Sequence, residues 1–183
     1  MAMQILAVGD LHLGAAPSRL PDELIARAAD LGTTGVWHRI VAQAIASRVD
    51  AVVLAGDVVD DEDDFFEAYR ELSSGVERLN GAGIRVLGVV GNHDVRVLPR
   101  LADQINGFEL LGHGGHWETA ELVAGSERLT LHGWSFPQRQ VTRSPLQGHE
   151  FRPGPGPNLG LLHGDRDQPA SVYAPVSTNE LDA

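Results

Sequence analysis

Three continuous apolar runs constrain the fold of this chain most strongly, because they repeat one arrangement along the sequence. The runs are residues 4–8, 51–55 and 84–90, and each ends in glycine followed by polar residues. Short apolar runs without polar alternation are typical of strands that are buried on both faces of a sheet. Helical patterns lie between the runs, and alternation of strands with helices predicts a parallel sheet with right-handed crossovers.

The two segments between these runs show the spacing of amphipathic helices. We expect one helix from about residue 34 to 48, with Thr33 or Thr34 as its N-cap, and a second over 65–79 that ends at Asn-Gly-Ala-Gly. The acidic run 61–64 is expected to begin the second helix, where negative charge is favourable. Residues 22–29 have the composition of a further short helix.

The second half of the chain is less regular but still contains strand and helix patterns. A helix is predicted from residue 98 to 105, with Pro99 in its first turn, and another begins at about Ser177. Further strands are predicted at 108–111, 116–123, 128–134 and 158–162. The chain is therefore expected to have an α/β fold.

Polar side chains follow four of the predicted strands at the point where each strand ends. These residues are Asp10, His12, Asp57, Asp60, Asn92, His93 and His163. The carboxyl ends of parallel strands meet at one edge of a sheet, which is where ligands bind in open α/β folds. Carboxylate and imidazole donors together suit Mn, Fe or Zn better than Mg or Ca.

Each of these motifs taken alone also has an ordinary explanation. Asp10 with His12 can be a loop acid beside an exposed histidine, and Asp57 can cap a helix. The run Asn-His-Asp at 92–94 can form an Asx turn, and His163 can be a plain strand-end residue. A metal site is favoured because all four strand ends carry such residues together.

Composition excludes several classes of protein. The net charge is −11, with 25 acidic and 14 basic residues, which argues against a protein that coats nucleic acid without specificity. The absence of cysteine excludes disulfides and thiolate metal sites. The N-terminus does not have the pattern of a signal peptide, and no apolar run approaches the roughly 20 residues that span a bilayer. We expect a cytoplasmic protein without a membrane partner.

The strand-end motifs, taken in order, resemble those of the calcineurin-like metallophosphoesterases. They are Gly-Asp-Leu-His at 9–12, Gly-Asp-Val-Val-Asp at 56–60, Gly-Asn-His-Asp at 91–94, and His163. The resemblance implies an α/β fold, with a two-sheet sandwich flanked by helices. It also implies hydrolysis of phosphate esters at a centre of two divalent metal ions, with Mn expected and Fe, Zn or Mg as alternatives.

The resemblance also assigns metal ligands to this sequence. It places Asp10 and His12 on the first metal, with Asp57 bridging the two ions. Asn92 and His163 correspond to ligands of the second metal.

Two further residues correspond to catalytic groups of the family. His93 matches the residue that stabilises developing charge or protonates the leaving oxygen, and Asp60 matches the carboxylate that orients it. These roles agree with general acid catalysis by an imidazole.

A narrower resemblance rests on residues 131–136, 158–163 and 173–175. These strings are similar to bacterial DNA-repair exonucleases related to the nuclease subunit of the SbcCD complex. That similarity implies metal-dependent cleavage of phosphodiesters at DNA ends, with an ATPase partner subunit in some relatives.

The family completes its metal centre with a Gly-His-x-His motif downstream of the residue that matches His163. The chain contains no such motif after His163, and the histidines of 112–116 have another spacing and precede it. We therefore expect one metallophosphoesterase domain over residues 1–183 that is truncated at its C-terminus and lacks its last strands. Its affinity for metal is expected to be reduced.

Three functions stay open at this point. The leading hypothesis is a DNA exonuclease-like phosphodiesterase. A phosphatase or phosphodiesterase for a small nucleotide is the alternative that suits an acidic protein better. The third is a non-catalytic binding domain with an incomplete metal site.

Overall fold

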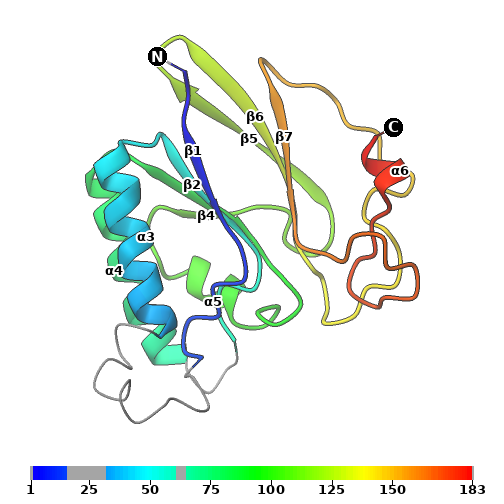
Figure 1. The fold of residues 1–183 in the computed structure, drawn as a ribbon, viewed down its shortest axis with the longest axis horizontal. Helices are drawn as coiled ribbons and strands as arrows, with labels where there is room; N and C mark the ends of the chain where they lie inside the picture. Colours follow the sequence, from blue (N-terminus) through cyan, green and yellow to red (C-terminus); the bar gives the residue numbers. More distant parts are fainter. Residues whose placement is uncertain (1, 16–31, 61–64, 183) are drawn as a thin grey trace.

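The computed structural model describes residues 2–15, 32–60 and 65–182 of the chain (Figure 1). Its elements are β1 (Ile5–Val8), α3 (Thr33–Ser47), β2 (Ala51–Ala55), α4 (Phe65–Gly81), β3 (Arg85–Val89), α5 (Leu98–Ala102), β4 (Phe108–Leu110), β5 (Trp117–Ala124), β6 (Glu127–Trp134), β7 (Asn158–Leu162) and α6 (Thr178–Leu181). The predicted helix at 22–29 and the acidic run 61–64 lie outside the described residues.

The first sheet contains β1, β2, β3 and β4 in that order, with every neighbouring pair parallel. Val53 in the middle of β2 pairs with Ala7 of β1 and with Leu87 of β3. The parallel sheet predicted from the apolar runs is therefore confirmed. Because the strands run in one direction, the loops that follow β1, β2 and β3 meet at the same edge.

Helices α3 and α4 cover one face of this sheet (Figure 1). Their side chains form a core with alternate residues of β2 and β3, including Val52 and Val86. Gly75 of α4 makes room for the buried Trp37 of α3, since a Cβ at Gly75 would lie 2.3 Å from the indole Nε1. The structure thereby explains why the helix pair packs closely at this point.

The predicted start of α3 needs a correction. Thr33 or Thr34 was expected as the N-cap, but Gly32 occupies this position and makes no side-chain capping hydrogen bond. The Thr33 hydroxyl instead donates to the carbonyl of Ala15, at 3.4 Å. Tertiary contact with the loop after β1 therefore replaces the expected local cap.

The second sheet contains β5, β6 and β7, with β5 and β6 antiparallel and β6 and β7 parallel. It packs on the other face of the first sheet through a second apolar cluster. In this cluster Val53 and Leu87 of the first sheet meet Leu131 and Leu161 of the second. The predicted α/β architecture of two packed sheets with flanking helices is confirmed.

Differences from the expected boundaries are small. The helix predicted over residues 98–105 ends at Ala102, and Pro99 lies in its first turn as expected. The predicted helix at Ser177 is the short α6, whose N-cap Ser177 forms a capping box with Glu180.

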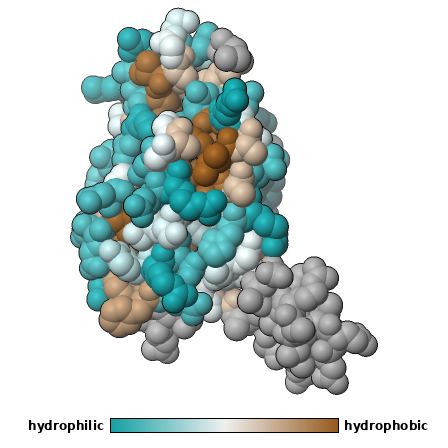
Figure 2. Space-filling view, turned by 90° about the vertical axis from the view of Figure 1, so that its left-hand side faces the viewer, coloured by the Kyte–Doolittle hydropathy of each residue, from teal (hydrophilic) through white to brown (hydrophobic). Residues whose placement is uncertain are grey.

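The side of the molecule that carries α3 and α4 is largely hydrophilic, with separate small hydrophobic patches (Figure 2). In the part of the chain that the structure describes, no helix combines the length and the apolar character needed to cross a membrane.

Candidate metal centre

The loops after β1 and β2 hold each other through backbone hydrogen bonds. The N–H of His12 donates to the carbonyl of Asp57 at 3.0 Å, and that of Leu13 donates to the carbonyl of Val58 at 2.8 Å. Asp10, His12 and Asp57 all have positive φ angles, of 52°, 47° and 49°. Residues other than glycine rarely adopt such angles, and they cluster at functional sites.

Six of the seven predicted residues form two compact groups. The first, here called the inner group, contains Asp10, Asp57 and His163, each of which offers a ligand atom within 4.8 Å of the others. The second, here called the outer group, contains His12, Asp60 and His93 with the same spacing limit.

The inner group is built from both sheets. Asp57 follows β2 of the first sheet, and His163 follows β7 of the second. His163 Nε2 lies 3.3 Å from Asp57 Oδ2, while its Nδ1 donates to the carbonyl of Ala55 at 3.1 Å. The two side chains are only 5% exposed at Asp57 and 17% at His163. The hydrogen bond to Ala55 fixes the ring so that Nε2 faces the carboxylate.

The outer group belongs to the loops of the first sheet alone. Asp60 Oδ1 lies 3.2 Å from His12 Nδ1 and 3.3 Å from His93 Nδ1. The two imidazole rings meet edge to face, with centroids 5.3 Å apart. Side chains here are 29% exposed at His12, 42% at Asp60 and 43% at His93. One carboxylate therefore contacts two imidazoles at a position that solvent reaches.

The inner pair shifts its own protonation equilibria. Burial alone raises the pKa of Asp57, but the hydrogen bond from His163, the backbone N–H of His93 and the charges of both imidazoles outweigh it, so the pKa is lowered. Burial alone lowers the pKa of His163, but the hydrogen bond and charge of Asp57 prevail and raise it. Without metal, the pair therefore favours a carboxylate beside an imidazolium.

Two glycines allow the strand ends to approach this closely. A Cβ at Gly91 would lie 2.1 Å from Asp57 Oδ1, and one at Gly56 would lie 2.7 Å from the Cβ of His163. Side chains at these positions would displace the loops. The glycine that precedes the polar residues in these two motifs is thus a packing requirement of the centre.

Asn92 is the predicted site residue that lies outside the two histidine and carboxylate groups. It is half-buried and stands between Gly91 and His93 in the chain. The backbone N–H of His93 donates to Asp57 Oδ1 at 2.9 Å, which brings this loop against the inner group.

One buried acid in this region had no role assigned from the sequence. Asp94 is 0% exposed and accepts hydrogen bonds from the backbone N–H groups of Val58 and Gly91, both at 2.7 Å. Burial raises its pKa to about 7, and the charge of Asp57 acts in the same direction, while the backbone hydrogen bonds oppose the shift. Its place as the last residue of Gly-Asn-His-Asp was the only signal in the sequence.

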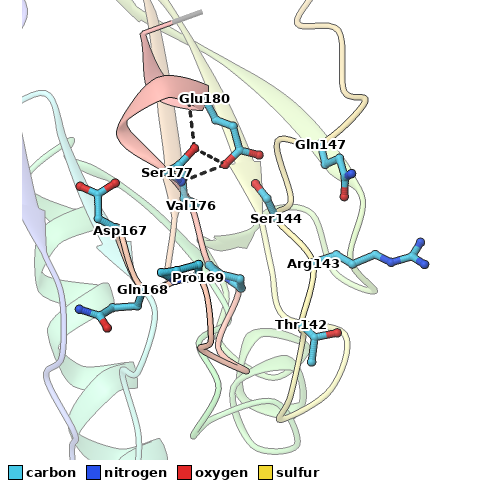
Figure 3. A pocket seen from close by; sticks show the side chains of 11 residues that line it. Thr142, Arg143, Ser144, Gln147, Asp167, Gln168, Pro169, Val176, Ser177 and Glu180 are labelled. Atoms are coloured by element: carbon cyan, nitrogen blue, oxygen red, sulfur yellow. Dashed lines mark hydrogen bonds between the residues drawn. The ribbon is translucent and has the colours of Figure 1, made fainter.

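A cavity of about 490 Å³ lies away from this centre, between residues 142–147 and 167–180 (Figure 3). None of the seven predicted site residues lines it. Ser177 and Glu180 face each other across its edge and are joined by the hydrogen bonds that cap α6. Their polar atoms are thus already used by the fold.

The donor chemistry of the two groups fits divalent metal ions. Each group offers carboxylate oxygen and imidazole nitrogen within the spacing that one ion requires. Asp57 also has its two oxygens in different contacts, Oδ1 with the His93 backbone and Oδ2 with His163. The arrangement can therefore hold metal for hydrolytic chemistry.

Comparison with known proteins agrees with this chemistry. The family model described as calcineurin-like phosphoesterase matches residues 3–175. The uncharacterized metallophosphoesterase YhaO of Bacillus subtilis is 35% identical over 190 residues, which cover 98% of this chain and 45% of that protein. The DNA double-strand break repair protein Mre11 of Methanosarcina mazei is 33% identical over 116 residues, 63% of this chain and 18% of that protein.

A solved structure with a similar arrangement is that of the nuclease MPE of Pseudomonas putida. It covers 92% of this chain and 66% of its own, with 17% identity and a TM-score of 0.43. The chain spans less than half the length of the curated relatives named above.

Proposed function

The chain belongs to the calcineurin-like phosphoesterase family, and from that premise we propose that it is a metal-dependent phosphodiesterase that acts on DNA ends. The observation that carries the proposal is the presence of the inner and outer groups in the loops at the ends of strands from the two packed sheets. The name of the similar Mre11 protein supports DNA as the substrate. An ATPase partner subunit, as in the nuclease complexes that the sequence resembles, belongs to the same proposal.

We assign the metal ligands around Asp57. Asp10 and His12 would hold one divalent ion, Asn92 and His163 the other, and Asp57 would lie between them. The position of Asp57 supports a bridging role, because Asp10 and His163 both converge on it. Manganese is the proposed metal, since mixed carboxylate and imidazole donors suit it. Such ions supply Lewis-acid polarisation of the phosphoryl group when bound.

His93 is the proposed proton donor to the leaving oxygen. Its Nδ1 faces Asp60 at 3.3 Å, which leaves Nε2 available to a substrate. The carboxylate fixes the orientation of the ring. The 43% exposure of the His93 side chain allows a bulky phosphodiester to reach it.

A second candidate is a phosphodiesterase for small nucleotides. The net charge of −11 favours it, because DNA backbones are usually bound by basic surfaces. A DNA-specific enzyme of this charge would need a basic partner surface, such as an ATPase subunit, to hold its substrate.

The test uses two substrates with Mn²⁺, namely linear duplex DNA and a chromogenic phosphodiester. Cleavage of both, abolished by a chelator and by Asp57→Asn, is the expected result. Cleavage of the chromogenic ester alone would favour the small-nucleotide function. Cleavage of neither would overturn the proposal and favour a binding domain. Asp50→Asn is the matched control. Asp50 directly precedes β2, the strand that Asp57 follows, and its carboxylate accepts a hydrogen bond from the N–H of Gln4.

A further inference from the structure

We propose that Asp94 is a positioning residue that sets the distance between the two loops on which the metal centre is built. The inference rests on the proposed metal centre but concerns a residue outside the ligand set. Asp94 lies in the loop after β3 and has no exposed surface, so it cannot touch substrate. Its action must therefore pass through the backbone that it holds.

The two carboxylate oxygens of Asp94 are bonded to different loops. Oδ2 accepts from the N–H of Val58, the residue directly after Asp57, at 2.7 Å. Oδ1 accepts from the N–H of Gly91, the residue directly before Asn92, also at 2.7 Å. One side chain therefore fixes the neighbours of two proposed ligands.

The loop after β2 accepts a hydrogen bond from the loop after β3 in the same way. Asp57 Oδ1 accepts from the N–H of His93 at 2.9 Å. Each loop thus supplies a carboxylate that accepts a backbone hydrogen bond from the other. We call this set of bonds the reciprocal brace, consisting of Asp57 and Asp94 with the N–H groups of Val58, Gly91 and His93.

A carboxylate is the group that suits this position. The N–H groups of Val58 and Gly91 bond to different oxygens of this side chain, and a group with two acceptor oxygens satisfies both. An asparagine would present its own N–H₂ to one of them. Burial of a carboxyl group costs free energy, and an apolar residue would fill the same space at lower cost for packing alone. The hydrogen bonds of the reciprocal brace offset that free-energy cost.

Loss of the reciprocal brace should lower the affinity of the centre for metal. Functional side chains need to be held within about 0.5 Å of their productive positions. Without Asp94, the loops after β2 and β3 would still be connected to the sheet, but Asp57 and His93 would lose their fixed separation. Residues that orient ligands from behind typically change metal affinity by about 10- to 100-fold.

The first test needs no metal. Amide hydrogen exchange in the metal-free protein should become faster at Val58 and Gly91 in Asp94→Asn, and also at His93, whose partner is Asp57 rather than Asp94. Glu71→Gln is the matched control, because Glu71 is also a buried carboxylate, bonded to His38 and Arg70. Unchanged exchange at His93 in Asp94→Asn, or equal acceleration in Glu71→Gln, would overturn the proposal.

The second test measures Mn²⁺ affinity by calorimetry. We expect it to fall about 10- to 100-fold in Asp94→Asn and to change less than threefold in Glu71→Gln. Should Asp94→Asn fail to fold, Asp94→Glu decides, since it keeps both oxygens and displaces them by one methylene. A normal affinity in the folded variant would overturn the proposal. Intact Mn²⁺ binding without any hydrolysis by the unmodified protein would overturn the proposed function and leave the brace standing.

Discussion

The inner and outer groups contain the same kinds of side chain but are built in different ways. The inner group joins the two sheets, and its central pair, Asp57 and His163, is nearly buried. The outer group comes from loops of one sheet, and its Asp60 and His93 are more than 40% exposed. Burial and the hydrogen bond from His163 to the Ala55 carbonyl fix Asp57 and His163 of the inner group, whereas contacts between exposed side chains hold Asp60 and His93 of the outer group.

This difference suggests that the two groups have different functions. A buried, oriented pair of donors such as Asp57 and His163 is suited to holding an ion, because these ligands need not reorganise on binding. An exposed pair of imidazole and carboxylate is suited to proton transfer, because substrate and water can reach it. We therefore expect substitutions of Asp57 and His163 to affect metal binding and those of Asp60 and His93 to affect turnover.

The strongest test of this division is Asp57→Asn. We expect phosphodiesterase activity to fall about 1000-fold, equivalent to about 4 kcal/mol of transition-state stabilisation, with a parallel loss of Mn²⁺ affinity. Steady-state kinetics and calorimetry measure the two effects. Asp50→Asn, at the other end of β2, should change neither. Full Mn²⁺ binding in Asp57→Asn would contradict the role of the inner group.

His93→Gln should separate turnover from binding. We expect kcat to fall about 100-fold because proton donation is lost, while Mn²⁺ affinity changes less than threefold. The same kinetic and calorimetric measurements apply. A large loss of Mn²⁺ affinity would instead make His93 a metal ligand and would remove the distinction between the two groups.

Asp60→Asn should have a smaller effect of the same kind. The variant keeps an acceptor for the imidazole but loses the charge, so we expect kcat to fall about tenfold. Its effect should be absent in the background of His93→Gln, because Asp60 is proposed to act through His93. Additive losses in the double variant would show that Asp60 acts elsewhere, for example on His12.

The smallest effect concerns the pH dependence of the metal-free protein. The raised pKa of His163 predicts an NMR titration midpoint above the ordinary value of 6.5, and Asp57→Asn should lower that midpoint. Stability from the raised pKa is complete below pH 6.5 and is lost as the pH rises through the folded value. The lowered pKa of Asp57 acts at acidic pH. The stabilisation that it contributes is complete above pH 3.8 and is lost as the pH falls through the lower, folded value. A midpoint for His163 at or below 6.5 would contradict the ion pair.

Much of the scaffold could be predicted from the sequence. Residues 51–55 and 158–162 were predicted as strands with the bounds that the structure shows. Such runs are reliable because short stretches made up mainly of apolar residues are typical of buried strands. The N-cap of α3 could not be predicted, since Thr33 is drawn into a contact with Ala15, which is distant in the sequence.

The way in which the site residues group together was harder to predict from the sequence. The family resemblance placed Asp10 and His12 on one ion, but the structure places Asp10 in the inner group and His12 in the outer. Both residues have positive φ angles, so the regular alternation of side chains along an extended strand does not apply to them. Whether they still share an ion stays a prediction.

The sequence by itself determined the strands, the glycines that end them and the polar residues that follow, because these depend on local patterns of hydrophobicity and backbone freedom. Only the tertiary structure decided which residues meet. His163 reaches Asp57 because the second sheet packs on the first, and Asp94 reaches Val58 because two loops approach across two glycines. Contacts between distant segments depend on the packing of whole layers, which no local pattern specifies.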